Sequence, residues 1–353
     1  MARFGGKSMR YVGLDIGSSS VKSVELTRKG SGYELQSIAM EPLAQDVVVD
    51  GAIMDATSVS NAISAIFTEN KIKSNDVVTS VSGHAVIVKR IAVAAASEEE
   101  VGNAVQYEAQ QYIPFDMADV SMDYQVLGPA PTGNAMDVML VAVKREKIQN
   151  LMHVLGLAGK TAAIVDIDAF ALQNAYEANY DPAPEQMAAL LNIGASIMNI
   201  NIVRGGVPLF TRDVSVGGNQ YTDTLQKELD LSYDDAEKLK QGQELPNVTA
   251  EARDTHIRSV SEILLLEIQK TFDFFRQTTS TDNIQAIYIG GGTAKIQGLA
   301  DLLREEFSIP VEILNPFKKV TINPSRFDQA FTADVGARMS VAVGLALRSF
   351  DTP

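Results

Sequence analysis

The chain has 353 residues, of which 46% are hydrophobic and 21% charged, a composition typical of a globular protein with more than one packing unit. Its formal net charge of −14 argues against a nucleic-acid partner and against general attraction to an anionic membrane surface. The sequence contains no cysteine, which excludes disulfides and thiolate metal sites, and its three histidines lie far apart without the spacing of metal ligands. We also expect no secretory signal, no membrane span and no amphipathic anchoring helix at the C-terminus.

Residues 1–83 predict the core of a first lobe. Apolar, β-branched segments separated by glycine turns favour strands, and a segment with one apolar face favours a helix. Residues 160–186 and 333–353 are assigned to the same lobe. The expected elements of the first 83 residues are strands at 11–16, 21–28, 33–40 and 77–82 and a helix at 57–70.

Residues 84–159 predict a separate, inserted α+β subdomain. Ser97 followed by three glutamates has the spacing of a capping box, which favours a helix that ends before Pro114. The expected elements of this insert are strands at 86–94, 122–127 and 137–143, a helix at 98–112 and a second helix from Arg145.

Residues 187–214 repeat the order of the opening, which is strand, glycine turn, strand, glycine turn and strand. Together with residues 284–332 they are assigned to the core of a second lobe, and residues 215–283 to a helical variable subdomain. The expected elements are strands at 188–194, 198–203, 208–214 and 284–289 and helices at 217–229, 234–241, 251–277, 299–307 and 335–348.

The turn between the first two strands carries residue types suited to a phosphate. The segment YVGLDIGSSSVK places Asp15, Gly17 and three serines ahead of Lys22. A tight Gly/Ser turn leaves backbone N–H groups free to bind phosphate, an Asp at its entry can hold a metal through water, and a Lys beyond it can reach anionic oxygens. Taken alone, this turn is also compatible with an ordinary β-hairpin.

Three apolar strands end in glycine turns, at Gly17, at Gly194 and at 290–292. Glycine allows the backbone to approach a flat ligand or a phosphate closely. Neither GxxxxGK[ST] nor GxGxxG occurs, so these turns are neither a P-loop nor a Rossmann turn. A packed strand-to-helix turn is the alternative for the third one.

Taken in order, these motifs resemble those of the actin-fold ATPases, which have a two-lobed α/β fold with a duplicated core. LDIGSSSVK resembles the first phosphate loop, LLNIGAS the second, and YIGGGTAKIQGL the adenosine motif. Residues 166–173 and 333–347 resemble the two connecting helices at the hinge. Within that fold, the position of the insert and the segment AEKLK resemble the FtsA-like branch. EAQQYIPFD, together with MDYQ, resembles the PilM family of type IV pilus assembly proteins.

This resemblance implies that the turns bind ATP or ADP with Mg²⁺, and it assigns no catalytic residue. Asp15 would hold Mg²⁺ through water, and Lys22 would neutralise phosphate charge. An ordinary i,i+3 ion pair is the alternative role for Glu237 and Lys240. The other implied nucleotide contacts are Gly17, Ser18, Ser19, Ser20, Gly194, Ala195 and Ser196 at the phosphates, Gly217 and Gly218 beside them at a helix N-terminus, Gly291, Gly292 and Lys295 at the adenosine, and Glu237 and Lys240 at the ribose or base.

One position departs from the pattern of the family. The second phosphate loop usually begins with Asp, which helps to hold the metal and its water, whereas this chain has Asn192. An amide adds no negative charge and cannot accept a proton, so we expect nucleotide binding with slow or absent hydrolysis. Asp166 and Asp168 are candidates to replace the missing carboxylate, and N-capping of the following helix is their alternative role.

The resemblance implies a scaffold at the cytoplasmic face of the inner membrane, held there by the short cytoplasmic tail of PilN. In the family this tail lies in a groove between the first lobe and the insert, and we expect it near the strand edge at 86–91 and the helix at 98–112. Other pilus platform proteins, motor ATPases and self-association are further candidate interactions. An FtsA-like cell-division protein and a small-molecule kinase of the same fold are the alternatives.

Overall fold

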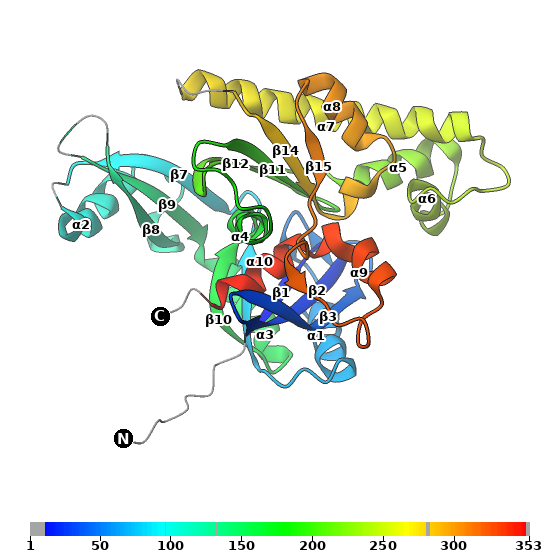
Figure 1. The fold of residues 1–353 in the computed structure, drawn as a ribbon, viewed down its shortest axis with the longest axis horizontal. Coiled ribbons are helices and arrows are strands. Elements are labelled where there is room, and N and C mark those ends of the chain that lie inside the picture. The colour runs from blue at the N-terminus through cyan, green and yellow to red at the C-terminus, as the bar shows by residue number, and fades with distance from the viewer. Residues whose placement is uncertain (1–10, 96, 131–132, 134, 280–282, 351–353) are drawn as a thin grey trace.

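Two β-sheets form the centres of two lobes, which lie one above the other in Figure 1. The computed structural model describes residues 11–350 except 96, 131–132, 134 and 280–282. The first sheet has the strand order β10-β6-β1-β2-β3-β16 and the second β13-β12-β11-β14-β15. The strands are β1 (Val12–Ile16), β2 (Ser20–Lys29), β3 (Gly32–Pro42), β6 (Asp76–Val81), β10 (Thr161–Ile167) and β16 (Val320–Thr321) in the first sheet, and β11 (Met187–Ile193), β12 (Met198–Arg204), β13 (Val207–Val214), β14 (Ala286–Gly290) and β15 (Val311–Ile313) in the second.

The two sheets share one plan. In the first, β1 pairs antiparallel with β2 and parallel with β6. In the second, β11 pairs antiparallel with β12 and parallel with β14. Each sheet therefore centres on a strand that enters a hairpin and also has a parallel neighbour. This arrangement confirms the α/β fold with a duplicated core that the repeated strand and glycine pattern predicts.

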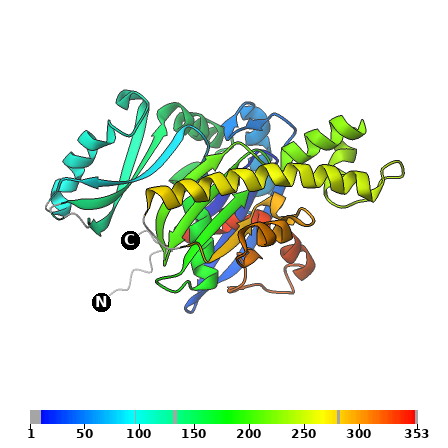
Figure 2. The ribbon, with the colours of Figure 1, turned by 90° about the horizontal axis from the view of Figure 1, so that it is seen from above.

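Helices cover both sheets. The helix α7 crosses the outer face of the second sheet (Figures 1 and 2), and its buried side chains, among them Leu264, Ile268 and Phe272, belong to the same apolar core as β11 and β12. The helices are α1 (Ala56–Glu69), α3 (Arg145–Leu157), α4 (Asp168–Tyr180), α5 (Gly218–Leu229), α6 (Tyr233–Lys240), α7 (Ala250–Thr278), α8 (Leu299–Phe307), α9 (Gln329–Val335) and α10 (Ser340–Arg348). Short elements are β4 (Val48–Val49), β5 (Ala52–Ile53) and the 3₁₀ turns η2 (Gly292–Lys295) and η3 (Gly336–Met339).

The insert is a three-stranded sheet of order β7-β9-β8 with one helix and an apolar core of its own. Ser97 is the N-cap of that helix, but its hydroxyl makes no capping hydrogen bond. Its elements are β7 (Val86–Val93), α2 (Glu98–Ala109), a 3₁₀ turn (Met117–Asp119), β8 (Val120–Pro129) and β9 (Met136–Lys144).

Packing shifts two of the expected domain boundaries. The helix α3 buries Leu151, Val154 and Leu155 in the core of the first lobe, because its apolar face packs mainly against α1. We therefore propose 86–144 as the extent of the insert in place of 84–159. The strand β16 pairs with β3, so the chain has returned to the first sheet by Val320, ahead of the expected return at 333.

Two helices, α4 and α10, lie between the lobes and pack against each other (Figure 1). Residues Gln329–Arg348, which include α10, form a helical run that is long and apolar enough to span a membrane by composition alone. The sequence predicted the helix only from residue 335 onward and predicted no segment of membrane-spanning length. The most apolar window of the run is 72% buried inside the protein, so its composition reflects a core position between the lobes.

The crossing of these two helices predicts a large effect for one glycine. A Cβ on Gly344 would lie 1.7 Å from the carbonyl oxygen of Ala171 in α4, so Gly344→Ala must push the helices apart. We expect the free energy of unfolding to fall by about 3 kcal/mol or more, because backbone cannot yield as a side chain does. Urea denaturation measures the change.

Gly156→Ala is the matched control. Gly156 lies in α3 and is exposed, and a Cβ there meets nothing within 4 Å. This substitution should leave the protein unchanged or stabilise it by roughly 0.5–1 kcal/mol through helix propensity. Equal effects at Gly344 and Gly156 would show that the helices do not depend on the glycine contact.

Candidate functional site

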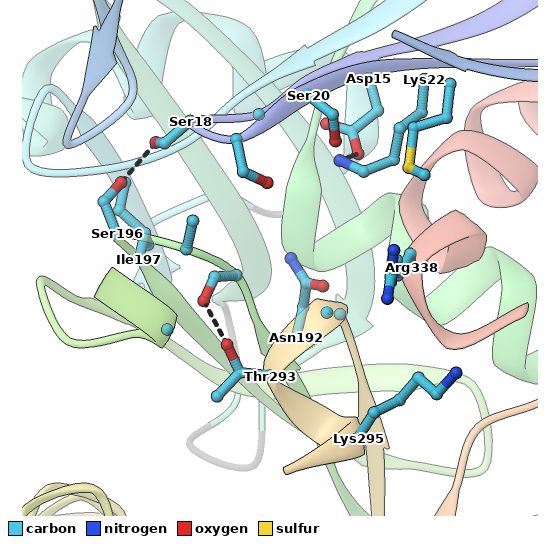
Figure 3. Close-up of a pocket in the computed structure, with 18 of the residues that line it drawn as sticks. Asp15, Ser18, Ser20, Lys22, Asn192, Ser196, Ile197, Thr293, Lys295 and Arg338 are labelled. Carbon is cyan, nitrogen blue, oxygen red and sulfur yellow. Dashed lines mark hydrogen bonds and ion pairs between the residues drawn. The ribbon is translucent and has the colours of Figure 1, made fainter. Parts of the chain in front are cut away.

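A cavity of about 520 Å³ lies between the lobes, where the ends of β1, β11 and β14 meet. It is lined by segments from both sheets and by the part of the helical run Gln329–Arg348 that precedes α10 (Figure 3). We call this part the connecting run. The residues predicted for the site that line it are Asp15, Gly17, Ser18, Ser19, Ser20, Lys22, Gly194, Ala195, Ser196, Gly218, Glu237, Lys240, Gly291, Gly292 and Lys295. Predicted site residues that are as far apart in the sequence as Asp15 and Lys295 therefore line the same cavity.

The two phosphate-type loops have the same backbone geometry. The N–H of Gly17 donates to the carbonyl of Ser20 at 3.1 Å, and the N–H of Gly194 donates to the carbonyl of Ile197 at 2.9 Å. The hydroxyls of Ser18 and Ser196 hydrogen-bond to each other across the two lobes (Figure 3). The first turn is thus part of a β-hairpin and also lines the cavity. The ordinary hairpin and the phosphate-binding turn, which were the two alternatives, are therefore compatible.

An ion pair joins the two strands of the first hairpin beside its turn. Asp15 and Lys22 lie directly opposite each other on β1 and β2, and Lys22 Nζ donates to Asp15 Oδ2 at 2.9 Å. Both side chains are nearly buried and line the cavity (Figure 3). A cation and a carboxylate thus reach the same end of the cavity, as a phosphate with a hydrated metal requires.

The start of α5 supports the second loop. The N–H of Gly218 donates to the carbonyl of Gly194 at 2.9 Å, and the N–H of Asn219 donates to that of Ala195 at 2.8 Å. Gly217 does not line the cavity. A Cβ on it would lie 2.6 Å from the carbonyl oxygens of Gly194 and Ala195. Gly217 therefore packs closely beneath the loop, and its expected place beside the phosphates stays a prediction.

The pair Glu237 and Lys240 forms the i,i+3 ion pair that was its alternative role, and it also lines the cavity. Thr222, which is buried in α5, hydrogen-bonds to both partners, and the bond from Lys240 Nζ to Thr222 Oγ1 is 2.8 Å long. This third contact fixes both side chains against α5, which a simple surface pair would not require.

The third glycine turn packs against the second loop. Gly291 has φ +85°, and a Cβ on it would lie 2.3 Å from the carbonyl oxygen of Ile193, so only glycine fits. Thr293 Oγ1 donates to the carbonyl of Gly194 at 2.8 Å, which joins the two turns (Figure 3). Lys295 forms an ion pair with Asp334, at the end of α9.

Several lining residues were not predicted from the sequence, among them Thr293, Asp334 and Arg338. Thr293 directly follows the glycine triplet, and its place in that motif was the available signal. Asp334 and Arg338 come from the connecting run, whose apolar pattern gives no sign of a polar side chain at the cavity. The side chains of Arg338 and Lys295 lie on the side of the cavity opposite the serine contact (Figure 3).

Asp168 is half-buried in the first turn of α4 and does not line the cavity. The Ser80 hydroxyl donates to its carboxylate at 2.6 Å. Burial, followed by the nearby carboxylate of Asp15, raises the pKa of Asp168 from 3.8 to about 6. Neither Asp168 nor Asp166 caps the helix, because the N-cap residue is Ile167. Asp166 instead faces Arg348 at 3.6 Å.

The donor set fits a hydrated Mg²⁺ better than a metal held by protein alone. Among the described residues, no group of three or more Asp, Glu or His side chains is placed to hold a metal ion. The cavity does contain the Asp15 carboxylate and the Asn192 amide, on opposite lobes (Figure 3). Mg²⁺ commonly keeps several waters and binds through one or two carboxylates plus phosphate oxygens.

The architecture and the cavity at its centre define the class of protein as the actin-like ATPase fold. The family profile of the type IV pilus assembly protein PilM matches residues 13–350, so the chain belongs to that family. This membership favours a pilus assembly protein over the cell-division and kinase alternatives.

Solved structures agree with this assignment. The structure described as the PilM-PilN type IV pilus biogenesis complex matches with a TM-score of 0.86 and 29% identity, over 97% of this chain and 99% of that one. The ethanolamine utilization protein EutJ from Carboxydothermus hydrogenoformans matches at 0.57 and 13% identity, over 96% and 89% of the two chains. MreB 5 of Spiroplasma citri bound to AMPPNP matches at 0.53 and 15% identity, over 96% and 95%. The latter two show the fold alone.

The raised pKa of Asp168 predicts a pH effect in nucleotide-free protein. A carboxyl whose folded-state pKa is raised binds its proton more tightly when folded, so it lowers stability as pH rises from about 4 to about 6. Asp168→Asn removes this cost and keeps an acceptor for Ser80. We expect the variant to gain about 2–3 kcal/mol of unfolding free energy above pH 6 and little near pH 4.

Denaturation of both proteins between pH 4 and pH 8 measures this difference. Asp166→Asn, two positions away and facing Arg348, is the control that should show no such gain. A loss of stability in Asp168→Asn that is the same at every pH would contradict the assignment of the pKa to Asp168.

Proposed function

We propose that the chain is a nucleotide-binding scaffold of the type IV pilus assembly machinery, with ATP or ADP in the cavity between the lobes. The observation that carries this proposal is the pair of matching loops at Gly17 and Gly194, which face each other through Ser18 and Ser196. Loops of this kind offer backbone N–H groups and hydroxyls to phosphate oxygens. The glycine turn at Gly291 offers an approach for the adenosine.

The roles of the charged residues follow from their pairing. Lys22, Lys240 and Lys295 line the cavity, and each forms an ion pair with an acid that also lines it. The lysines therefore carry little uncompensated charge toward a triphosphate. Arg338 and the Mg²⁺ that comes with the nucleotide would then supply the counter-charge, with Asp15 holding the ion through water.

Hydrolysis is proposed to be slow or absent. A general base must lie within hydrogen-bond reach of the attacking water, directly or through one further water. Asn192 cannot accept a proton, and Asp168 does not line the cavity and has its carboxylate bonded to Ser80. Asp15 is engaged by Lys22. The chain therefore offers groups that hold phosphate more than groups that activate water.

A charge-removal variant tests nucleotide binding. Lys22→Ala deletes the cation beside the first loop and leaves Asp15 without its partner, so the dissociation constant for Mg²⁺–ATP should rise at least about tenfold, or about 1.4 kcal/mol. Lys29→Ala on the same strand is the control, because Lys29 is exposed and pairs with Glu34 away from the cavity. Titration calorimetry gives both constants.

Two results would contradict the proposal. One is the absence of nucleotide affinity in the unmodified protein, and the other is equal affinity in Lys22→Ala and Lys29→Ala. Steady phosphate release by the pure protein at an ordinary enzymatic rate would contradict the holding role alone.

We further propose that the partner is the cytoplasmic tail of PilN, which would hold the protein at the inner membrane. The support is the similarity to the PilM-PilN complex over nearly the full length of both chains. The groove between the first lobe and the insert is the proposed site. The insert exposes two aromatic side chains, Tyr107 on α2 at 71% and Tyr124 on β8 at 38%. Contacts with other platform proteins, motor ATPases or a second copy remain proposals without a surface.

Tyr107→Ala and Tyr124→Ala test the place of this partner. Aromatic side chains dominate many interfaces, so at least one variant should weaken binding of a PilN-tail peptide about tenfold in a fluorescence polarisation assay. Ile263→Ala, on the exposed face of α7 in the other lobe, should bind as the unmodified protein does. Unchanged affinity in both tyrosine variants would place the tail away from the insert.

A further inference from the structure

Three polar side chains lie in a row across the second sheet. Asn192 on β11 is directly opposite Asn199 on β12, and Asn199 is directly opposite Asp213 on β13. Asn192 Nδ2 donates to Asn199 Oδ1 at 2.8 Å, and Asn199 Nδ2 donates to Asp213 Oδ1 at 2.8 Å. The other oxygen of Asp213 accepts from the backbone N–H of Gly83 in the first lobe. We refer to these four residues as the polar ladder.

The carboxylate fixes the direction of every bond in the polar ladder. A carboxylate accepts at both oxygens, and Gly83 supplies a donor to one of them. Asn199 must then turn its NH₂ group toward Asp213 and its oxygen toward Asn192. Asn192 must in turn give its NH₂ group to Asn199, which leaves its own Oδ1 as the free end. Asn199 is only 1% exposed, so water does not offer it another arrangement.

The free end of the polar ladder lies at the cavity. Asn192 is a lining residue and points into the space across from Asp15 (Figure 3). Its Oδ1 receives no hydrogen bond within the polar ladder and is therefore the acceptor that Asn192 offers there, beside the second N–H of its own amide. Carbonyl and carboxylate oxygens are the ligands that hard divalent cations take from proteins.

We propose that Asp213 and Asn199 are positioning residues that aim Asn192 Oδ1 at the hydrated divalent cation of the bound nucleotide. This inference rests on the proposed nucleotide function. It gives the Asn at the start of the second loop a defined role, as a neutral oxygen ligand held in one orientation. The negative charge of the polar ladder lies at Asp213, two side chains away from the cavity. Asp213 also has the charged groups of Lys147 and Asp168 near it.

The same geometry predicts what each substitution does. In Asn192→Asp, Asn199 lies between two carboxylates, and its oxygen must face an acceptor. In Asp213→Asn, the new amide accepts from Gly83 and turns its NH₂ group toward Asn199. Both asparagines must then reverse, and Asn192 presents NH₂ to the cavity. In the double variant Asn192→Asp/Asp213→Asn, the reversed row satisfies every bond and places a carboxylate at the cavity.

The double-mutant cycle is measured in two ways on the full chain. Thermal melting without nucleotide or metal should show a lowered melting temperature in Asn192→Asp that the added Asp213→Asn restores. Binding of Mn²⁺ in the presence of a non-hydrolysable ATP analogue, followed by electron paramagnetic resonance, should weaken about tenfold in Asp213→Asn. The double variant should bind Mn²⁺ more tightly than the unmodified protein. Asp301→Asn, an exposed change of equal charge on α8, is the control and should alter neither quantity.

The outcomes separate the polar ladder from the proposed function. Melting effects that simply add in the double variant, or unchanged Mn²⁺ affinity in Asp213→Asn, would overturn the polar ladder. No nucleotide-dependent Mn²⁺ binding in the unmodified protein would overturn the cation role together with the proposed function. The melting cycle would then still show whether the row has a fixed direction.

Discussion

Both lobes depend on how closely α10 approaches the backbone around it. A Cβ on Gly13 in β1 would lie 2.2 Å from the carbonyl oxygen of Ala342, and one on Gly344 would lie 1.7 Å from that of Ala171 in α4. The helix therefore touches the central strand of the first sheet and the helix that packs under the second. Because β1 and β11 each end in a loop, this crossing sets where the two loops meet.

The cavity follows from that crossing, and its electrostatics follow from pairing. Each lysine that lines the cavity forms an ion pair with an acid. Lys22 pairs with Asp15 across the hairpin, Lys240 with Glu237 one helical turn away, and Lys295 with Asp334 of the connecting run. The three lysines are thus paired with acids, while Arg338 adds a further positive charge to the lining. An enzyme that turns over a triphosphate needs a base near the attacking water. Here the acids are bonded, and the second loop begins with an amide whose orientation the polar ladder fixes. These features support the proposal that the cavity retains a nucleotide and hydrolyses it slowly or not at all.

Local signals accounted for most of the fold and much of the site. Glycine after an apolar strand marks a turn wherever it occurs, so the loops at Gly17 and Gly194 and the shared plan of the sheets were accessible from sequence. The hydrogen bond from Thr293 to Gly194 joins residues 99 positions apart, so no local sequence pattern predicts it. Gly217 was assigned to the phosphates by resemblance, and the sequence did not predict that its missing side chain also allows close backbone packing. The proposed domain boundaries differ from the expected ones because α3 packs on the core of the first lobe and β16 pairs with β3 of its sheet. Local sequence patterns do not show such long-range contacts.

We propose that one nucleotide is held between two matching loops of opposite lobes. A crystal structure with Mg²⁺ and a non-hydrolysable ATP analogue tests it most directly. We expect the terminal phosphates between Ser18 and Ser196, replacing the bond between their hydroxyls, with the adenosine along the Gly291 turn and Asn192 Oδ1 facing the hydrated metal. A nucleotide bound outside the cavity, or a cavity that stays empty while Ser18 and Ser196 remain bonded at saturating nucleotide, would contradict the account.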